Sequence, residues 1–183
     1  RLNDPELDEQ QRCGVARELY RAGDRDKEHI LFDILSGEDD FAHTHAAESL
    51  YKTAGIGDGV AMRRAFSPDR PITLRLMAAG ALAKAGDREA MDFLRENLRA
   101  EDPETFKIAA WILGRIGGRE DIEPIRSRIE DASDPLIRAY LEHSLAALGD
   151  PSGLAALGTN LEDDEPDIRT YAATFAGDAR AIQ

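Results

Sequence analysis

The sequence predicts an all-α fold, an α-α superhelix in which about six two-helix repeats stack as a solenoid. Gly-Asp pairs, replaced once by Gly-Gly, recur with 34, 29, 31, 32 and 28 residues between successive first glycines. A proline preceded by a charged residue recurs between these pairs. Alanine and leucine dominate the apolar residues and aromatic residues make up only 6% of the chain, which suits closely packed helices better than a sheet.

Each Gly-Asp pair is predicted to mark a tight turn between two helices. Glycine adopts the left-handed conformation that ends a helix, and the aspartate after it can cap the helix that follows. The first glycines of these pairs are Gly23, Gly57, Gly86, Gly117, Gly149 and Gly177.

The prolines are predicted to start the first helix of each repeat. A proline at the first helical position loses no hydrogen bond, and an acidic residue before it can cap the free amides and complement the helix dipole. The pairs are Asp102-Pro103 and Asp134-Pro135, with the variants Arg70-Pro71 and Glu165-Pro166 and a further copy at Asp4-Pro5.

These signals divide the chain into repeats over 5–36, 40–66, 70–99, 102–130, 134–161 and 165–183, the last one cut short. The proline-led helices are predicted over 5–22, 40–54, 70–85, 102–116, 134–148 and 165–176. Their partner helices are predicted over 24–36, 58–66, 87–99, 119–130 and 150–161. We treat residues 1–183 as a single repeat domain and, because the chain starts at Arg1, as a possible fragment of a longer protein.

Three proline-led segments carry a family resemblance: Pro135–Asp150 (PLIRAYLEHSLAALGD), Pro71–Asp87 (PITLRLMAAGALAKAGD) and His43–Asp58 (HTHAAESLYKTAGIGD). They resemble the second helix of HEAT repeats, particularly the subtype named after phycobilisome bilin lyases. The resemblance covers nearly the whole chain and is specific for fold rather than function, since such repeats occur in lyases, adaptors, hydroxylases and glycosylases.

The resemblance implies a structural ladder of charged side chains between neighbouring repeats. The matching positions are Arg75, Lys107, Arg138 and Arg169, with Asp102 and Asp134 as their expected partners. It also implies that the proline-led helices line a concave face. The residues that vary between copies on this face are Glu48, Trp111, Tyr140, His143 and Tyr171.

The net charge of −13, from 23 basic and 36 acidic residues, argues against nucleic acid and against an anionic membrane surface as partners. Its simplest interpretation is solubility, and the alternative is a basic protein partner. No stretch is apolar for long enough to insert into a membrane and no signal peptide is visible, so we expect a cytoplasmic protein.

No catalytic, metal or cofactor site can be argued from the residues. His43 and His45 lie two apart and so point in different directions on a helix, which leaves His45 and Glu48 as a pair too small for zinc. Cys13 is the single cysteine and has no partner base nearby in sequence, so a small buried residue is the better interpretation.

The sequence therefore predicts a non-enzymatic scaffold that binds a protein or peptide along its concave face. Trp111, Tyr140 and Tyr171 are large amphipathic residues of the type that anchors interfaces, although they could instead pack between helices. The alternative function, suggested by the repeat subtype alone, is an accessory subunit of a bilin lyase. A DNA glycosylase is disfavoured by the acidic charge.

Overall fold

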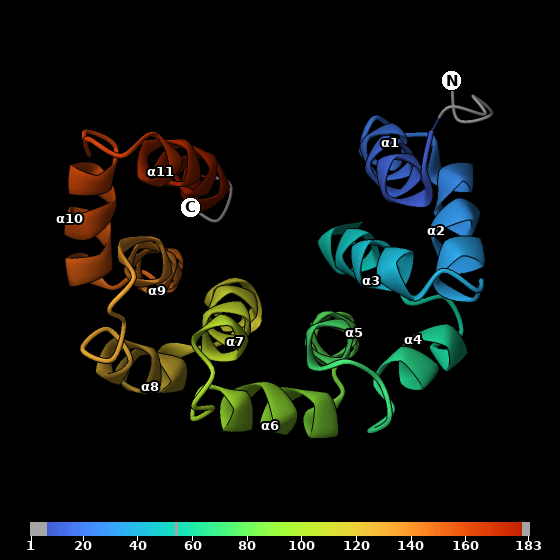
Figure 1. Cartoon of the computed structure of the whole chain (residues 1–183), viewed down its shortest axis with the longest axis horizontal. Helices are drawn as coiled ribbons and strands as arrows, with labels where there is room; N and C mark the ends of the chain where they lie inside the picture. The colour runs from blue at the N-terminus through green and yellow to red at the C-terminus, as the bar shows by residue number, and fades with distance from the viewer. Residues whose placement is uncertain (1–6, 54, 181–183) are drawn as a thin grey trace. The chain divides into compact units, whose positions relative to one another are not determined.

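The computed structural model describes residues 7–53 and 55–180, with only the backbone for Asp40 and residues 177–180. This part of the chain is helical and holds no β-strand, which confirms the predicted all-α solenoid class. The helices are α1 (Glu9–Arg21), α2 (Glu28–Leu35), α3 (Asp40–Thr53), α4 (Val60–Ala65), α5 (Ile72–Lys84), α6 (Arg88–Asn97), α7 (Pro103–Ile116), α8 (Ile122–Ser127), α9 (Pro135–Ala147), α10 (Pro151–Asn160) and α11 (Pro166–Arg180), with 3₁₀ turns η1 (Arg25–Lys27) and η2 (Arg119–Asp121) (Figure 1).

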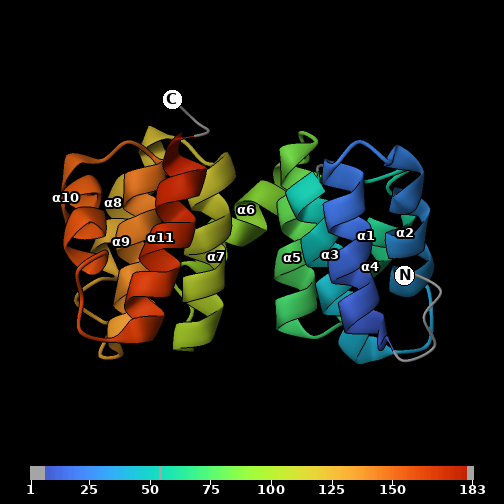
Figure 2. The same cartoon turned by 90° about the horizontal axis from the view of Figure 1, so that it is seen from above.

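The chain divides into two compact units, unit 1 up to Met91 and unit 2 from Asp92, and the division falls inside α6. In unit 1, the first layer consists of α1, α3 and α5 side by side, with α2 and α4 in the second layer. In unit 2, the first layer consists of α7, α9 and α11, with α8 and α10 in the second layer (Figure 2). By its place in the repeat, between α5 and α7, α6 is counted with the second-layer helices. The predicted single domain over 1–183 depends on how the units sit together, and it stays a prediction.

The helix starts at Pro103 and Pro135 follow the capping chemistry predicted from the sequence. The Asp102 side chain accepts a hydrogen bond from the Thr105 amide at 2.9 Å, and Pro103 is the first residue of α7. The Asp134 side chain accepts from the Leu136 amide at 2.7 Å at the start of α9. These bonds satisfy amides that have no partner within the helix. At Arg70-Pro71 the prediction is wrong, because α5 begins at Ile72 and Pro71 is its N-cap residue, with no side-chain cap. Asp4 and Pro5 lie outside the described residues.

The turns follow the prediction at most positions. Gly86 has φ of 97°, and the Asp87 amide donates back to the Leu82 carbonyl at 3.1 Å, which closes α5. Gly117 differs, with φ of −78°. There the Asp121 carboxylate accepts from the Gly118 amide at 2.9 Å, so a side chain closes the turn instead of a left-handed glycine.

The last predicted turn is absent, because α11 continues through Gly177 and Asp178 to Arg180. The prediction of a helix end at residue 176 is therefore wrong. Glycine inside a helix costs only about 1 kcal/mol, so a single glycine does not end a helix by itself. In three of the other copies the amide of the residue after the glycine donates back to the preceding helix, namely those of Asp24, Asp87 and Asp150.

Small residues allow the first-layer helices to approach closely. A Cβ atom at Gly114 of α7 would lie 2.9 Å from the Ser144 Cα atom of α9, so the two backbones are nearly in contact. The alanine-rich faces of α5 and α7 are buried in the same way. Among the described helices, none has the length and apolar character needed to cross a membrane.

Candidate functional site

Two tyrosines predicted to contact a partner lie together on neighbouring helices of unit 2. The rings of Tyr140 on α9 and Tyr171 on α11 are 4.8 Å apart between centroids, and both side chains are half-buried. Phe175, one turn after Tyr171, lies 5.6 Å from the Tyr140 ring and is buried. The two tyrosines therefore pack against each other and against Phe175, and part of each side chain remains at the surface of the first layer. Phe175 was not predicted as part of this site, although its spacing of four residues from Tyr171 places both on one helical face.

His143 lies beneath this pair, and only 1% of its surface is exposed. Its ring centroid is 4.7 Å from that of Phe175, and its Nε2 atom is 3.4 Å from Asn160 Nδ2. Burial lowers the pKa of His143 to about 4, so the ring is neutral at physiological pH. Within the described part of the chain, its Nδ1 atom has no hydrogen-bond partner. His143 therefore packs against Phe175 and Asn160 in the interior of unit 2, and its predicted contact with a partner stays a prediction.

Lys107 links α7 to the tyrosine pair. Its Nζ atom lies 5.0 Å from the centre of the Tyr140 ring and forms an ion pair of 2.5 Å with Glu104. Trp111, one turn further along α7, is buried, and the Arg115 guanidinium lies 4.9 Å above its ring. Trp111 therefore packs mainly inside the helical layers. Of the predicted stripe in unit 2, only Tyr140 and Tyr171 present substantial surface.

Glu48 belongs to unit 1 and lies in a polar hollow of about 410 Å³ between α1 and α3. Its carboxylate accepts from Lys52 Nζ at 2.5 Å, and its second oxygen is 4.0 Å from His45 Nδ1. The hollow is lined by Asp8, Gln10, Gln11, Cys13, Gly14, Arg17, His45, Glu48 and Ser49. These groups suit hydrogen bonds to a polar ligand or a peptide backbone.

Cys13 lines this hollow but is 1% exposed. Burial raises the pKa of its thiol to about 11, so the reactive thiolate is scarce at neutral pH. Across the residues that the structure describes, no three His, Cys, Asp or Glu side chains gather in a way that would hold a metal ion.

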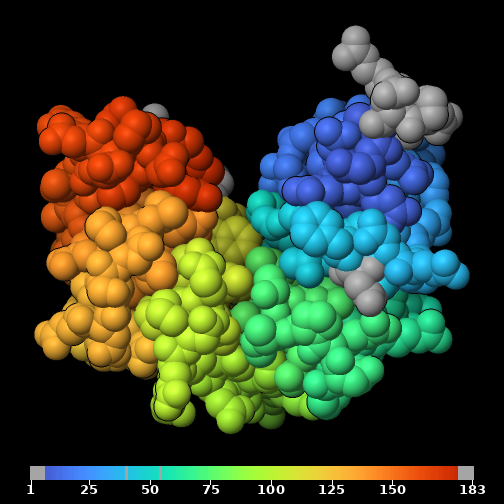
Figure 3. Space-filling model, viewed as in Figure 1, coloured from blue at the N-terminus to red at the C-terminus, as the bar shows by residue number. Residues whose placement is uncertain are grey.

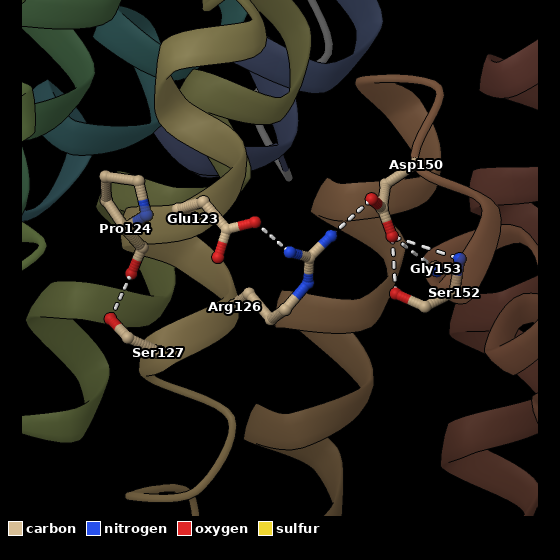
Figure 4. A network of polar contacts seen from close by, with 7 residues as sticks. All are labelled: Glu123, Pro124, Arg126, Ser127, Asp150, Ser152 and Gly153. Carbon is tan, nitrogen blue, oxygen red and sulfur yellow. Dashed lines mark hydrogen bonds and ion pairs between the residues drawn. The ribbon is translucent and has the colours of Figure 1, made fainter.

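The ion pairs that link neighbouring repeats lie in the second layer. Arg63 of α4 pairs with Asp87, Arg95 of α6 with Asp121 at 2.8 Å, and Arg126 of α8 with Asp150 at 2.5 Å. Figure 4 shows Arg126 between Glu123 on its own helix and Asp150, which also binds Ser152 and Gly153 at the start of α10. Each arginine therefore links one second-layer helix to the start of the second-layer helix in the next repeat.

The role of these three arginines was not predicted, although the sequence contains a signal for it. Arg63, Arg95 and Arg126 lie 32 and 31 residues apart, which matches the repeat period. The expected ladder stays a prediction, although five of its six residues make other contacts. Asp102 and Asp134 cap helices, and Lys107 pairs within its own helix while also touching Tyr140. Arg138 pairs with Glu142 at 3.0 Å, and Arg169 donates to the carbonyl of Asp163 at 2.6 Å. Arg75 is half-buried on α5.

A match to one family model supports the repeat fold. Residues 60–146 match a family model described as HEAT repeats. No curated protein sequence matches the chain. The structure of human deoxyhypusine hydroxylase in complex with glycerol is similar to 97% of this chain and 82% of its own, with 16% identity and a TM-score of 0.46.

Proposed function

We propose that this chain, which carries HEAT repeats over residues 60–146, is a non-enzymatic scaffold that binds a protein or peptide across its first layer. HEAT repeats commonly serve as protein-interaction scaffolds. The observation that carries the proposal is the Tyr140–Tyr171 pair, because rigid, half-buried tyrosines supply contact area at little entropic cost.

The remaining predicted residues have distinct parts in this proposal. Trp111 and His143 are buried, so in this proposal they serve the packing of α7 and α9 and not the contact with the partner. Glu48 provides a polar contact in the hollow of unit 1. The net charge of −13 favours a basic partner and speaks against nucleic acid.

The test measures capture of the partner from native lysate by the immobilised chain, quantified by mass spectrometry. Tyr140→Ala and Tyr171→Ala should each reduce capture of the same protein, and the double variant should reduce it most. Tyr20→Ala is the matched control, because Tyr20 is also half-buried and lies under a cation, Arg25, at 4.2 Å. Undiminished capture by the double variant would rule out the tyrosine pair as the anchor.

A second proposal, an accessory subunit of a bilin lyase, rests only on the resemblance of the repeats to the subtype named after these lyases. Adding bilin to the purified chain should then change the visible absorbance spectrum of the pigment. An unchanged difference spectrum at saturating protein would exclude this function.

A further inference from the structure

Helix α10 has an unusual composition for this chain. Residues Pro151–Asn160 (PSGLAALGTN) contain no charged side chain, whereas 32% of the whole chain is charged. The other second-layer helices α2, α4, α6 and α8 all carry charged residues. Figure 3 shows residues 151–165, in orange to orange-red, forming part of the surface of unit 2.

One face of α10 is apolar and open. Leu154 and Leu161 are 41% and 42% exposed, and their separation of seven residues places them on the same side of the helix. Between them lies Gly158, which is exposed and whose Cβ position has no atom within 4 Å. We name Leu154, Gly158 and Leu161 the α10 face. The small residue in its centre would let another helix approach closely.

The equivalent positions of earlier repeats are occupied differently. Leu98, two repeat periods before Leu161, is only 2% exposed. Gly158 lies 32 residues after Arg126. It therefore occupies the position that Arg63, Arg95 and Arg126 occupy in earlier repeats. The α10 face therefore keeps an apolar residue, Leu161, at a position that is buried in an earlier repeat. At Gly158 it lacks the arginine that links earlier repeats.

An acidic rim follows directly after the α10 face. Five carboxylates lie within 162–167: Glu162, Asp163, Asp164, Glu165 and Asp167. Within the described residues none of them forms an ion pair. The nearby Arg169 guanidinium donates to the backbone carbonyls of Asp163 and Asp164, at 2.6 and 2.7 Å, and not to their carboxylates. In the described part of the chain, the rim therefore presents carboxylates without a direct cationic partner next to the exposed Leu161.

We propose that the α10 face docks a basic amphipathic helix of a partner protein. The apolar side of that helix would cover Leu154 and Leu161, and its lysines or arginines would meet the acidic rim. Charge complementarity selects this occupant: an anionic membrane would be repelled by the rim, and a second copy would bring the same carboxylates to the contact. This surface lies in the second layer and does not depend on the tyrosine pair.

The test uses the full chain and a defined probe, a labelled helical peptide with leucines on one face and lysines on the other. Its binding is followed by fluorescence anisotropy at about 0.15 M salt, so that diffuse attraction is screened. A peptide with glutamate in place of lysine is the charge control. The proposal predicts that the lysine peptide binds at least about tenfold more tightly than the glutamate peptide.

Gly158→Arg is the decisive variant. It places a bulky cation in the centre of the α10 face, where the Cβ meets no other atom, and arginine favours a helix more than glycine does. It should keep the fold and weaken the lysine peptide by about tenfold or more. Leu154→Ser with Leu161→Ser should have a similar effect. Val60→Ser with Ile72→Ser is the matched control, since these residues are 49% and 38% exposed elsewhere.

The rim is tested separately. Asp164→Asn with Glu165→Gln should weaken binding, whereas Glu130→Gln with Asp131→Asn, in the acidic turn one repeat earlier, should not. Unchanged binding in Gly158→Arg, equal loss in both acidic turns, or a dimer of the chain that Gly158→Arg dissociates would overturn the proposal. Tyr140→Ala and Tyr171→Ala should leave peptide binding unchanged. The proposal for the α10 face and the proposal for the tyrosine pair are therefore tested independently.

Discussion

The Arg126 guanidinium lies 2.5 Å from the Asp150 carboxylate, and the same carboxylate accepts hydrogen bonds from the Ser152 and Gly153 amides at 3.0 and 3.3 Å. Asp150 therefore both caps α10 and joins α10 to α8. The Ser152 hydroxyl also donates to this carboxylate, and that bond, with the amide bonds and the Arg126 charge, lowers the pKa of Asp150 below its ordinary value. A single carboxylate thus couples local helix formation to the stacking of two repeats.

Asp150→Ala should destabilise the chain by about 1–2 kcal/mol, because it removes the helix cap as well as the ion pair. Arg126→Ala should have the smaller effect, since its side chain is 40% exposed and can be solvated. Urea unfolding measures both. The Asp150 contribution is fully present above the unfolded-state pKa and is lost as pH falls through its lowered folded-state pKa. A larger loss in Arg126→Ala than in Asp150→Ala would contradict this assignment.

Two glycines on α10 should respond in opposite ways to alanine. A Cβ at Gly153 would lie 2.3 Å from the Ala146 amide nitrogen and 2.7 Å from the Glu142 carbonyl, so Gly153→Ala should cost about 3 kcal/mol. At Gly158 the Cβ meets nothing within 4 Å, so Gly158→Ala should stabilise by about 0.5–1 kcal/mol. Urea midpoints of the two variants give the comparison. Equal shifts would mean that α9 and α10 are less tightly packed than the structure has them.

Acid should destabilise unit 2 through His143. Burial lowers its pKa from 6.5 to about 4, so the unfolded state binds more protons than the folded state between these values. Stability should therefore fall by about 3 kcal/mol as pH drops from 7 to 4. The negative charge of Glu142 acts in the opposite direction and raises the pKa of His143. The measurement is urea unfolding against pH, with His143→Gln as the comparison, because carboxylates also titrate in this range. Parallel curves for the two proteins would refute the assignment.

Cys13 should be protected from thiol reagents in the folded chain. Its thiol is 1% exposed and its pKa is raised to about 11, so both access and thiolate are lacking. Labelling by a maleimide at pH 7.5 should be slow in buffer and fast in urea. Rapid labelling under native conditions would show that the packing of α1 against α3 opens readily.

Helix starts were predicted more successfully than the conformation of the turns. Helix starts at Pro103, Pro135 and Pro166 follow from local rules, because a cap and a proline act within one turn of the chain. The left-handed turn at Gly117 was predicted wrongly, because a side chain three residues after Gly118 takes over the closing hydrogen bond. That choice depends on where Arg95 holds Asp121, which is a contact between repeats.

The sequence by itself determined the repeat period, the helical class and the capping residues, since these arise from interactions within a few residues. Only the tertiary structure decided that Tyr140 and Tyr171 reach the surface whereas Trp111 and His143 do not. All four lie at variable positions of the proline-led helices, so the repeat pattern does not distinguish the exposed residues from the buried ones. Their exposure depends on how closely the neighbouring helix packs, and that distance is set by side chains about 31 residues away in the chain.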